Sequence, residues 1–167
     1  MFTLKKATSQ DHPLACTFLE QARAYQRAQG FVQWTDNNPN SDTLAADIAQ
    51  GKGYLLCEDG TPIGYVYIDL TGEPAYGHLT EGAWKVAAPY AAVHRVAFGA
   101  EARGRGASKQ LFACIKELVA AHGIRLLRID THRDNKLMQH VLAREGFVYC
   151  GVVHYGTAER IAYELSF

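Results

Sequence analysis

Hydrophobic and polar residues alternate along this chain in two different patterns, and each pattern predicts one type of secondary structure. Short apolar runs predict strands, and apolar residues three and four positions apart predict the buried face of a helix. The clearest case begins with an apolar strand pattern over residues 90–98. A turn follows, and then a helical stripe that includes Leu111, Ile115, Leu118 and Val119.

The same patterns predict the whole order of elements, β-α-α-β-β-β-α-β-α-β-β. The dipeptide Asp59-Gly60 predicts a tight hairpin turn, and Ser41 is expected to cap the second helix. Residues 31–40 and 71–89 lack periodicity and are expected to be loops. The expected strands are 2–7, 54–58, 63–70, 90–98, 124–131, 147–155 and 160–165; the expected helices run from about residue 9 to 30, from 41 to 51, after residue 106, and from 134 to 145.

The segment between the central strand and its helix is rich in glycine and reads Arg103-Gly104-Arg105-Gly106-Ala107-Ser108. The first-turn N–H groups of a helix have no intrahelical acceptor, and the helix dipole adds partial positive charge there. Glycines allow an oxyanion to approach the backbone without meeting a Cβ atom. Because each charge-assisted hydrogen bond contributes about 1.5–3 kcal/mol, several such amides can hold a pyrophosphate. This segment is therefore expected to bind phosphate.

Two common phosphate-binding motifs do not fit this segment. A Walker loop that starts at Gly99 has Arg105 and Gly106 where Lys and then Ser or Thr are required. A dinucleotide fingerprint on Gly104 and Gly106 requires a third glycine where Lys109 stands, and no acidic residue follows at the expected distance. Both motifs are excluded.

Composition limits the range of functions. The chain has 167 residues, the size of one domain, with 17 basic and 17 acidic residues. Since its net charge is zero, no general field attracts nucleic acid or an anionic membrane. No apolar run has the length of a membrane span and the first residues lack a signal-peptide core, so a cytoplasmic location is expected. The cysteines are scattered and the histidines have no metal-ligand spacing, so neither a disulfide nor a metal is expected.

The remaining glycine pattern, Arg103 to Ser108, resembles the loop with which GCN5-related N-acetyltransferases (GNAT) bind the pyrophosphate of acetyl-coenzyme A. A second motif, Asp130-Thr131-His132-x-Asp134-Asn135-x-x-Met138-Gln139 followed by Glu145-Gly146-Phe147, resembles the strand and helix that flank coenzyme A in this superfamily. A bacterial subgroup of largely unassigned substrate has similar residues, including Gln33-Trp34 and His94-Arg95. The resemblance covers nearly the whole chain.

The resemblance implies a single α/β acyltransferase domain with a mixed, mostly antiparallel sheet of six or seven strands, splayed at the centre and flanked by about four helices. It implies acetyl transfer to an amine, with acetyl-coenzyme A as donor. The central strand would supply an oxyanion-binding N–H at Val96 and pair with pantetheine through Val96, Ala97 and Phe98. The pyrophosphate would bind residues 103–109, from Arg103 to Lys109, and Asn135 would contact pantetheine or a neighbouring phosphate.

Two residues depart from the family pattern. Ser108 replaces the small apolar residue at the end of the loop, which still allows backbone contact and adds a hydroxyl. Leu142 stands where many members have a tyrosine that reprotonates the departing thiolate. Catalysis therefore requires another proton donor or solvent. Tyr155 is a candidate for this donor, and packing in a terminal strand is its alternative role.

An amine attacks a thioester only when it is neutral, so a general base is needed. His94 is the first candidate, because imidazole titrates near neutral pH and strand alternation puts it on the face of Val96 and Phe98. A buried histidine that fixes the strand is the alternative. His132 follows a strand near the expected cofactor, where it either lines the substrate pocket, caps the next helix or contacts solvent.

Aromatic side chains in the two long loops are candidates for the acceptor pocket. Trp34, Tyr76 and Trp84 could form its walls, although aromatic residues in loops more often anchor the loop to the core.

Three functions fit the sequence to different degrees. The preferred one is an N-acetyltransferase acting on a primary amine of a small molecule or peptide, with a homodimer implied by the resemblance. A non-catalytic acyl-coenzyme A binding module is favoured by Leu142. An enzyme that acts on charged transfer RNA is disfavoured by the neutral charge balance.

Overall fold

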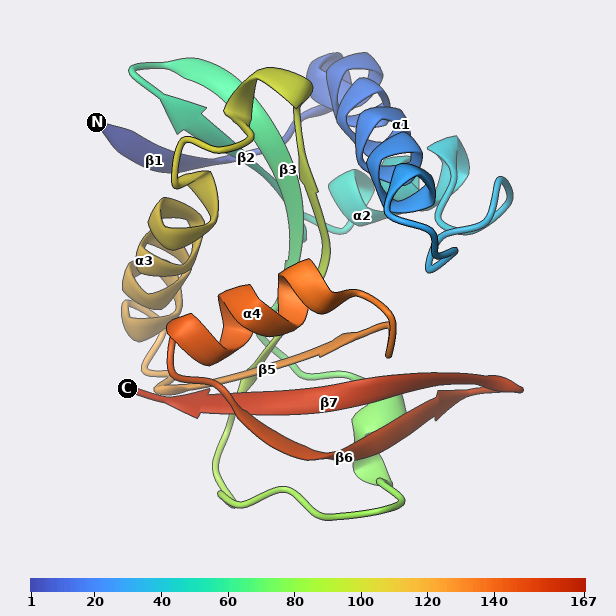
Figure 1. The fold of residues 1–167 in the computed structure, drawn as a ribbon. Helices are drawn as coiled ribbons and strands as arrows, with labels where there is room; N and C mark the ends of the chain where they lie inside the picture. Colours follow the sequence, from blue (N-terminus) through green and yellow to red (C-terminus); the bar gives the residue numbers. More distant parts are fainter. The chain divides into compact units, whose positions relative to one another are not determined.

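The computed structural model describes residues 1–167 and contains seven strands and four α-helices (Figure 1). Three short 3-10 helices, η1 (Ser9–Asp11), η2 (Pro74–Gly77) and η3 (Ala100–Ala102), lie in connections. The strands are β1 (Phe2–Lys6), β2 (Gly53–Glu58), β3 (Thr61–Asp69), β4 (Ala91–Phe98), β5 (Leu126–Thr131), β6 (Val148–Tyr155) and β7 (Ala158–Ser166), and the helices are α1 (His12–Ala28), α2 (Ser41–Ala49), α3 (Ala107–Ala120) and α4 (Lys136–Arg144).

The strands have the order β1-β2-β3-β4-β5-β7-β6 in a mixed sheet. Strands β4 and β5 pair in parallel, and this ladder joins Ala91, Ala92 and Val93 to residues 127–129. The chain forms two compact units, one of residues 1–68 and 95–115 and the other of residues 69–94 and 116–167. Strand β4 crosses from one unit to the other between His94 and Arg95.

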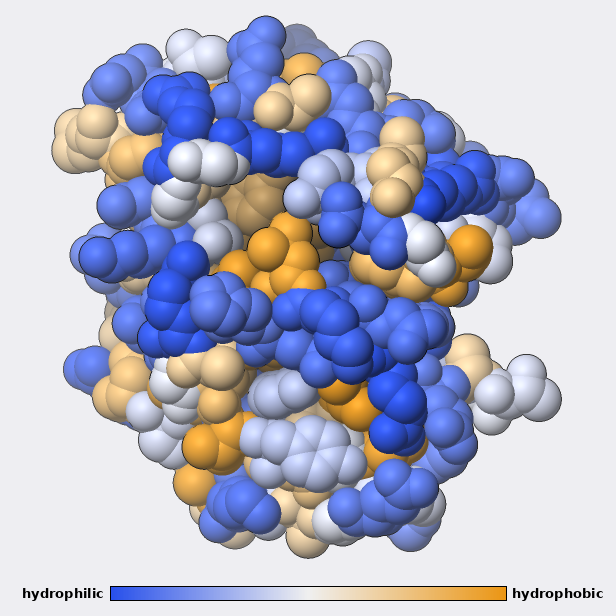
Figure 2. All heavy atoms as spheres, in the orientation of Figure 1, coloured by the Kyte–Doolittle hydropathy of each residue, from blue (hydrophilic) through white to orange (hydrophobic).

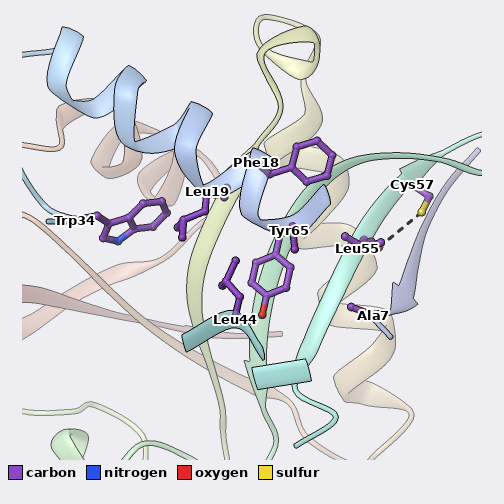
Figure 3. Close-up of a cluster of buried hydrophobic side chains, with 10 residues drawn as sticks. Ala7, Phe18, Leu19, Trp34, Leu44, Leu55, Cys57 and Tyr65 are labelled. Atoms are coloured by element: carbon purple, nitrogen blue, oxygen red, sulfur yellow. Dashed lines mark hydrogen bonds between the residues drawn. The ribbon is translucent and has the colours of Figure 1, made fainter. Parts of the chain in front are cut away.

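The first unit has its own hydrophobic core beneath α1 and α2, which lie side by side (Figures 1 and 3). Strands β1, β2 and β3 pair antiparallel, and their inward side chains meet one face of each helix. Pro13 lies in the first turn of α1, where a missing N–H costs nothing. The cluster of buried residues is Ala7, Ala15, Phe18, Leu19, Trp34, Leu44, Leu55, Cys57, Tyr65 and Ala97.

A charged group is buried at one end of this core. Arg95 donates two hydrogen bonds to Asp47, of 2.8 and 2.7 Å, and its guanidinium lies 4.5 Å from the ring centroid of Tyr67. The Tyr65 hydroxyl donates to the same carboxylate at 3.0 Å. Arg95 has φ +55°, a left-handed conformation that is rare for a residue with a Cβ atom. The contacts of its side chain therefore hold a kink in the middle of β4.

In the second unit, β5, β7 and β6 pair antiparallel, and the segment between β3 and β4 is attached to them. Thr80 forms a β-bridge with Val152, and Lys85 N–H donates to Glu164 at 2.7 Å. Arg128 donates to the carbonyl of Val86 at 2.7 Å and stacks between the rings of Trp84 and Tyr90. This long segment is therefore fixed in place, although it has little regular structure.

The predicted element order is confirmed, and most boundaries agree within about three residues. The Asp59-Gly60 turn has φ values of +49° and +82°, as its hairpin type requires. One cap was wrong: Asn40, and not Ser41, caps α2, because its side chain accepts from Thr43 N–H while Thr43 Oγ1 accepts from Asn40 N–H. A reciprocal capping box of this kind satisfies two helix-end donors at once.

Figure 2 shows hydrophilic and hydrophobic residues interspersed over one face of the molecule. None of the helices has both the length and the apolar character that crossing a membrane requires.

The buried pair gives a prediction for stability. Asp47→Ala leaves Arg95 without its carboxylate and removes the acceptor of Tyr65. We expect a loss of about 3 kcal/mol in the free energy of unfolding, the lower end for breaking a buried pair, because Arg95 is partly exposed. Urea denaturation measures this loss. Asp42→Ala, an exposed change in the first turn of the same helix, should cost about 0.5 kcal/mol; equal losses in the two variants would contradict a special role for Asp47.

Tyr65 gives a prediction for alkaline pH. Burial, and then the negative charge of Asp47, raise the pKa of Tyr65 well above its ordinary value. The unfolded chain thus loses this proton near pH 10 while the folded chain retains it, so the stabilisation is complete below pH 10 and is lost as pH rises. Above pH 10 the unfolding free energy of the wild type should fall by up to about 1.4 kcal/mol per pH unit more than that of Tyr65→Phe. Parallel curves for the two proteins between pH 9 and 11 would disprove this.

Candidate functional site

The glycine loop enters α3 with its amides directed away from protein acceptors. Gly104 and Gly106 both have φ +73°, and a Cβ atom added at either would meet nothing within 4 Å. The N–H groups of residues 104–107 donate no hydrogen bond within the protein, whereas Lys109 N–H, one turn later, donates to Gly106 O at 3.1 Å. The loop thus offers four adjacent donors, open space and the positive end of a 14-residue helix.

The basic side chains of the loop are held by the protein. Arg103 donates to Gln21 O at 2.8 Å and stacks 4.2 Å from the Tyr25 ring centroid. Arg105 is half exposed and pairs with Glu58 at 2.8 Å. Both contacts brace the loop against α1 and β2. Lys109 is exposed, and Ser108, at the second position of α3, is half-buried.

The central strand changes character at the kink. Residues 91–93 are fully buried, whereas Val96 and Phe98 are partly exposed and Ala97 is buried between them. Gly64 of β3 lies against this segment, since a Cβ atom there would be 3.0 Å from Ala97 O. Because Arg95 interrupts the alternation, the expectation that His94 shares a face with Val96 and Phe98 loses its basis.

In the second unit, His94 lies between two carboxylates. Its Nε2 is 3.1 Å from Glu73 Oε2, and its Nδ1 is 3.8 Å from Asp130 Oδ2. The hydroxyls of Tyr76 and Tyr155 donate to the same Asp130 oxygen at 2.6 and 2.7 Å. These five residues come from four separate segments, so the fold assembles a connected polar cluster.

The titration behaviour of the cluster follows from its contacts. The contact with His94 lowers the pKa of Glu73, which is therefore ionised at neutral pH. Burial, and then the charge of Asp130, raise the pKa of both Tyr76 and Tyr155. Since each tyrosine donates its proton in a hydrogen bond to Asp130, both remain protonated at neutral pH.

The sequence indicated three members of this cluster, His94, Tyr76 and Tyr155, but not the roles of Glu73 and Asp130. The carboxylate of Glu73 also accepts from Ala75 N–H at 3.1 Å, at the start of η2. Nothing in the sequence around Glu73, which precedes a proline in a loop, indicates that its side chain contacts His94, 21 positions later. Asp130 belonged to the recognised motif, yet only the fold shows what it contacts.

Asn135 and His132 lie at the entrance to α4. Asn135 caps the helix through Oδ1, which accepts from Met138 N–H at 3.1 Å. His132 Nδ1 accepts from Asp134 N–H at 3.1 Å, which is the helix-entry role considered as its alternative. Burial, and then the nearby Arg160, lower the pKa of His132. Both residues therefore help to shape this turn.

The aromatic candidates for the pocket are mostly core residues. Trp34 is 8% exposed and lies beside Leu19 in the first core (Figure 3). Tyr76 is 1% exposed, and Trp84 packs on it and donates to Tyr76 O at 2.7 Å. No group of three or more metal-ligating side chains occurs.

Comparisons with known proteins give a consistent result. A family model described as acetyltransferase (GNAT) family matches residues 16–147. A GNAT-family acetyltransferase from Streptococcus agalactiae has 29% identity and a TM-score of 0.90, over 99% of this chain and 95% of that chain. A search of curated proteins found no match.

Two more distant structures share the fold. PaiA N-acetyltransferase from Thermoplasma acidophilum, solved with coenzyme A, has 16% identity and a TM-score of 0.70, over 100% of this chain and 99% of that chain. Aminoglycoside acetyltransferase AAC(6')-Ib, solved with coenzyme A and also with kanamycin, has 19% identity and a TM-score of 0.70, over 99% and 95%. Since the family model covers far more than half of the sequence and the fold agrees, this chain belongs to the acetyltransferase (GNAT) family.

Proposed function

We propose that this protein transfers an acetyl group from acetyl-coenzyme A to a primary amine of a small molecule or peptide, by direct attack when both are bound. The observation that carries the proposal is the set of four unpaired amides at the start of α3. Crystallisation of two distant structural relatives with coenzyme A supports the choice of donor.

The proposed binding site for the pyrophosphate, called the cradle below, is the glycine loop of residues 103–109, and it is formed chiefly by the main chain. Amides of residues 104–107 donate to pyrophosphate oxygens, and the open φ +73° glycines let those oxygens approach. Arg103 and Arg105 add positive charge while their own contacts keep the loop in shape. Ser108 and Lys109 extend the same turn, and Asn135 is the proposed contact to pantetheine or its phosphate. No metal is required for this binding.

The segment after the kink is the proposed site of the thioester. Val96 N–H stabilises the negative charge that develops on the carbonyl oxygen, an interaction of about 2.7–4 kcal/mol in other enzymes. Val96, Ala97 and Phe98 pair with pantetheine as an added strand would. The left-handed residue before them and the end of the β5 ladder at Val93 support this assignment.

Proton transfer is assigned to the polar cluster of the second unit. His94 accepts the proton that the amine loses, and the leaving thiolate takes a proton from Tyr155 or from solvent. Leu142, at the usual tyrosine position, is fully buried and apolar. The Tyr155 hydroxyl donates to Asp130 and has to turn away from it before it can protonate the thiolate. Solvent is therefore the preferred proton donor when the site is open to water. Tyr76 and His132 are the proposed acceptor-side residues of this unit, and Trp34 is a separate candidate in the first unit.

The buried Leu142 also favours a second candidate, an acyl-coenzyme A binding module without catalysis. A distant relative solved with kanamycin supports the enzyme, because that ligand is a small-molecule amine. The two candidates differ in one observable, the release of free thiol.

The first test measures that observable. Acetyl-coenzyme A and a panel of primary amines, including polyamines, aminoglycosides and peptide N-termini, are incubated with the protein, and free thiol is followed. We expect release above the no-amine background with at least one class, together with a product heavier by one acetyl group. Tight binding of acetyl-coenzyme A without release for any amine would favour the binding module, and no binding by calorimetry would remove both candidates.

The second test concerns the cradle. Gly106→Leu brings a side chain into the space where phosphate oxygens approach, so one or more charge-assisted hydrogen bonds are lost. We expect the Kd for acetyl-coenzyme A to rise about 10- to 100-fold, as a loss of about 1.5–3 kcal/mol implies. Gly123→Leu is the matched control, because Gly123 has φ +75° and equally open space but lies beyond the other end of α3. It shares the backbone strain, so equal affinities in the two variants would refute the cradle.

A further inference from the structure

We propose that Arg128 is a positioning residue for the acceptor side of the site. It holds the aromatic rings of Trp84 and Tyr90. These two residues in turn hold the backbone of two members of the polar cluster, Tyr76 and Glu73. The inference rests on the proposed acetyl transfer, and it adds to that proposal a residue of β5 that does not itself belong to the cluster.

Arg128 joins the segment between β3 and β4 to strand β7. Its guanidinium carbon lies 4.1 Å from the ring centroid of Trp84 and 4.2 Å from that of Tyr90. Its Nη2 donates to Val86 O at 2.7 Å, and its Nε donates to Glu164 at 3.4 Å. A planar guanidinium can make all these contacts together, because its faces stack on rings while its edge donates hydrogen bonds. Arg128 therefore fixes the segment at residues 84, 86 and 90.

The two rings that stack on Arg128 both reach the polar cluster. The indole N–H of Trp84 donates to Tyr76 O at 2.7 Å, and the rings of these two residues pack with centroids 5.2 Å apart. The Tyr90 hydroxyl accepts from Glu73 N–H at 3.1 Å and donates to Glu73 O at 3.3 Å. Because these bonds are made to backbone atoms, they fix the place from which the Tyr76 and Glu73 side chains extend.

Strand β5 holds the segment at two neighbouring points. Arg128 and Asp130 are two positions apart on this strand, so they lie on the same face of the sheet. Asp130 accepts the Tyr76 hydroxyl at 2.6 Å, while Arg128 holds the residues around Tyr76. A displacement of η2 by about 1 Å would lengthen the bond to Asp130 beyond the normal range. The contacts of Arg128 therefore maintain a hydrogen bond that Arg128 does not make.

Glu164 completes the arrangement. It is buried beside Arg128, and its Oε1 accepts from Lys85 N–H at 2.7 Å. Since Arg128 binds the carbonyl of the next residue, the peptide bond between Lys85 and Val86 is held from both sides. Both of these residues are exposed. Only the pair of Arg128 and Glu164 is thus expected to keep this peptide bond from local opening.

The test compares the wild type with Arg128→Lys. Lysine retains the positive charge beside Glu164, so the buried carboxylate keeps a counter-ion, but a compact ammonium cannot stack on two rings and also bind Val86 O. With the most active amine of the panel described above, we expect kcat/KM for the amine to fall about 10- to 100-fold, the scale of a misplacement of about 1 Å. The Kd for acetyl-coenzyme A should stay within about twofold of the wild-type value, because the cradle belongs to the first unit.

Arg125→Lys is the matched control. Arg125 is exposed, directly precedes β5 and lies 5.9 Å from the ring centroid of Phe167, so its aromatic partner is the C-terminal residue and not a residue of the segment. We expect wild-type kcat/KM and Kd. If Arg128→Lys behaved like this control in an enzyme that acetylates an amine, the proposed role of Arg128 would be wrong. Equal losses in kcat/KM for the amine and in affinity for acetyl-coenzyme A would also contradict it, because they would indicate general damage to the fold.

Limited digestion with trypsin is a readout that does not depend on activity. Lys85 is the only lysine or arginine between residues 71 and 89. Cleavage of a native protein follows the population of its locally open form. We expect the wild type and Arg125→Lys to resist cleavage after Lys85, and Arg128→Lys to lose this protection and give fragments 1–85 and 86–167 by mass spectrometry.

The digestion separates the two proposals. Protection of Lys85 in Arg128→Lys equal to that in the wild type overturns the inference, even if the activity changes. If the wild type acetylates no amine, the proposed function fails, and the digestion still decides whether Arg128 holds the segment.

Discussion

The hydrogen-bonded pair of Asp47 and Arg95 is the interaction on which the arrangement of the central strand depends. A residue with a side chain in the left-handed region costs about 1–2 kcal/mol, and here two hydrogen bonds and a stacked tyrosine ring offset that cost. The kink lies directly after His94 and directly before Val96. It therefore ends the regular alternation of β4 directly before the segment that we propose as the site of the thioester.

The two candidate regions differ in physical character. The glycine loop presents main-chain amides without protein acceptors, and its arginines brace it, since Arg103 stacks on Tyr25 and Arg105 pairs with Glu58. The cluster around His94 consists of polar side chains that contact one another, with Asp130 accepting from both Tyr76 and Tyr155. In the proposed function, cofactor binding therefore relies on the backbone, and proton transfer relies on side chains that the fold brings together.

The sequence predicted the features that depend on local pattern. Strand and helix periodicity gave the element order, and the glycines before α3 indicated the amide cradle, because both signals lie within a few residues. The kink at Arg95 could not be predicted, since arginine has no preference for the left-handed region. The Glu73–His94–Asp130 contacts could not be predicted either, because they join residues 21 and 36 positions apart through the fold. For Trp34 the sequence left two roles open, pocket wall or anchor of the loop, and only the fold shows that it is buried beside Leu19 in the first core.

The most direct measurement is a crystal structure of the protein with coenzyme A. We expect pyrophosphate oxygens within hydrogen-bond distance of the amides of residues 104–107, with pantetheine alongside Val96 and Phe98. A coenzyme bound elsewhere, or a pyrophosphate held only by arginine side chains while these amides face solvent, would contradict the main-chain cradle and the proposed chemistry with it.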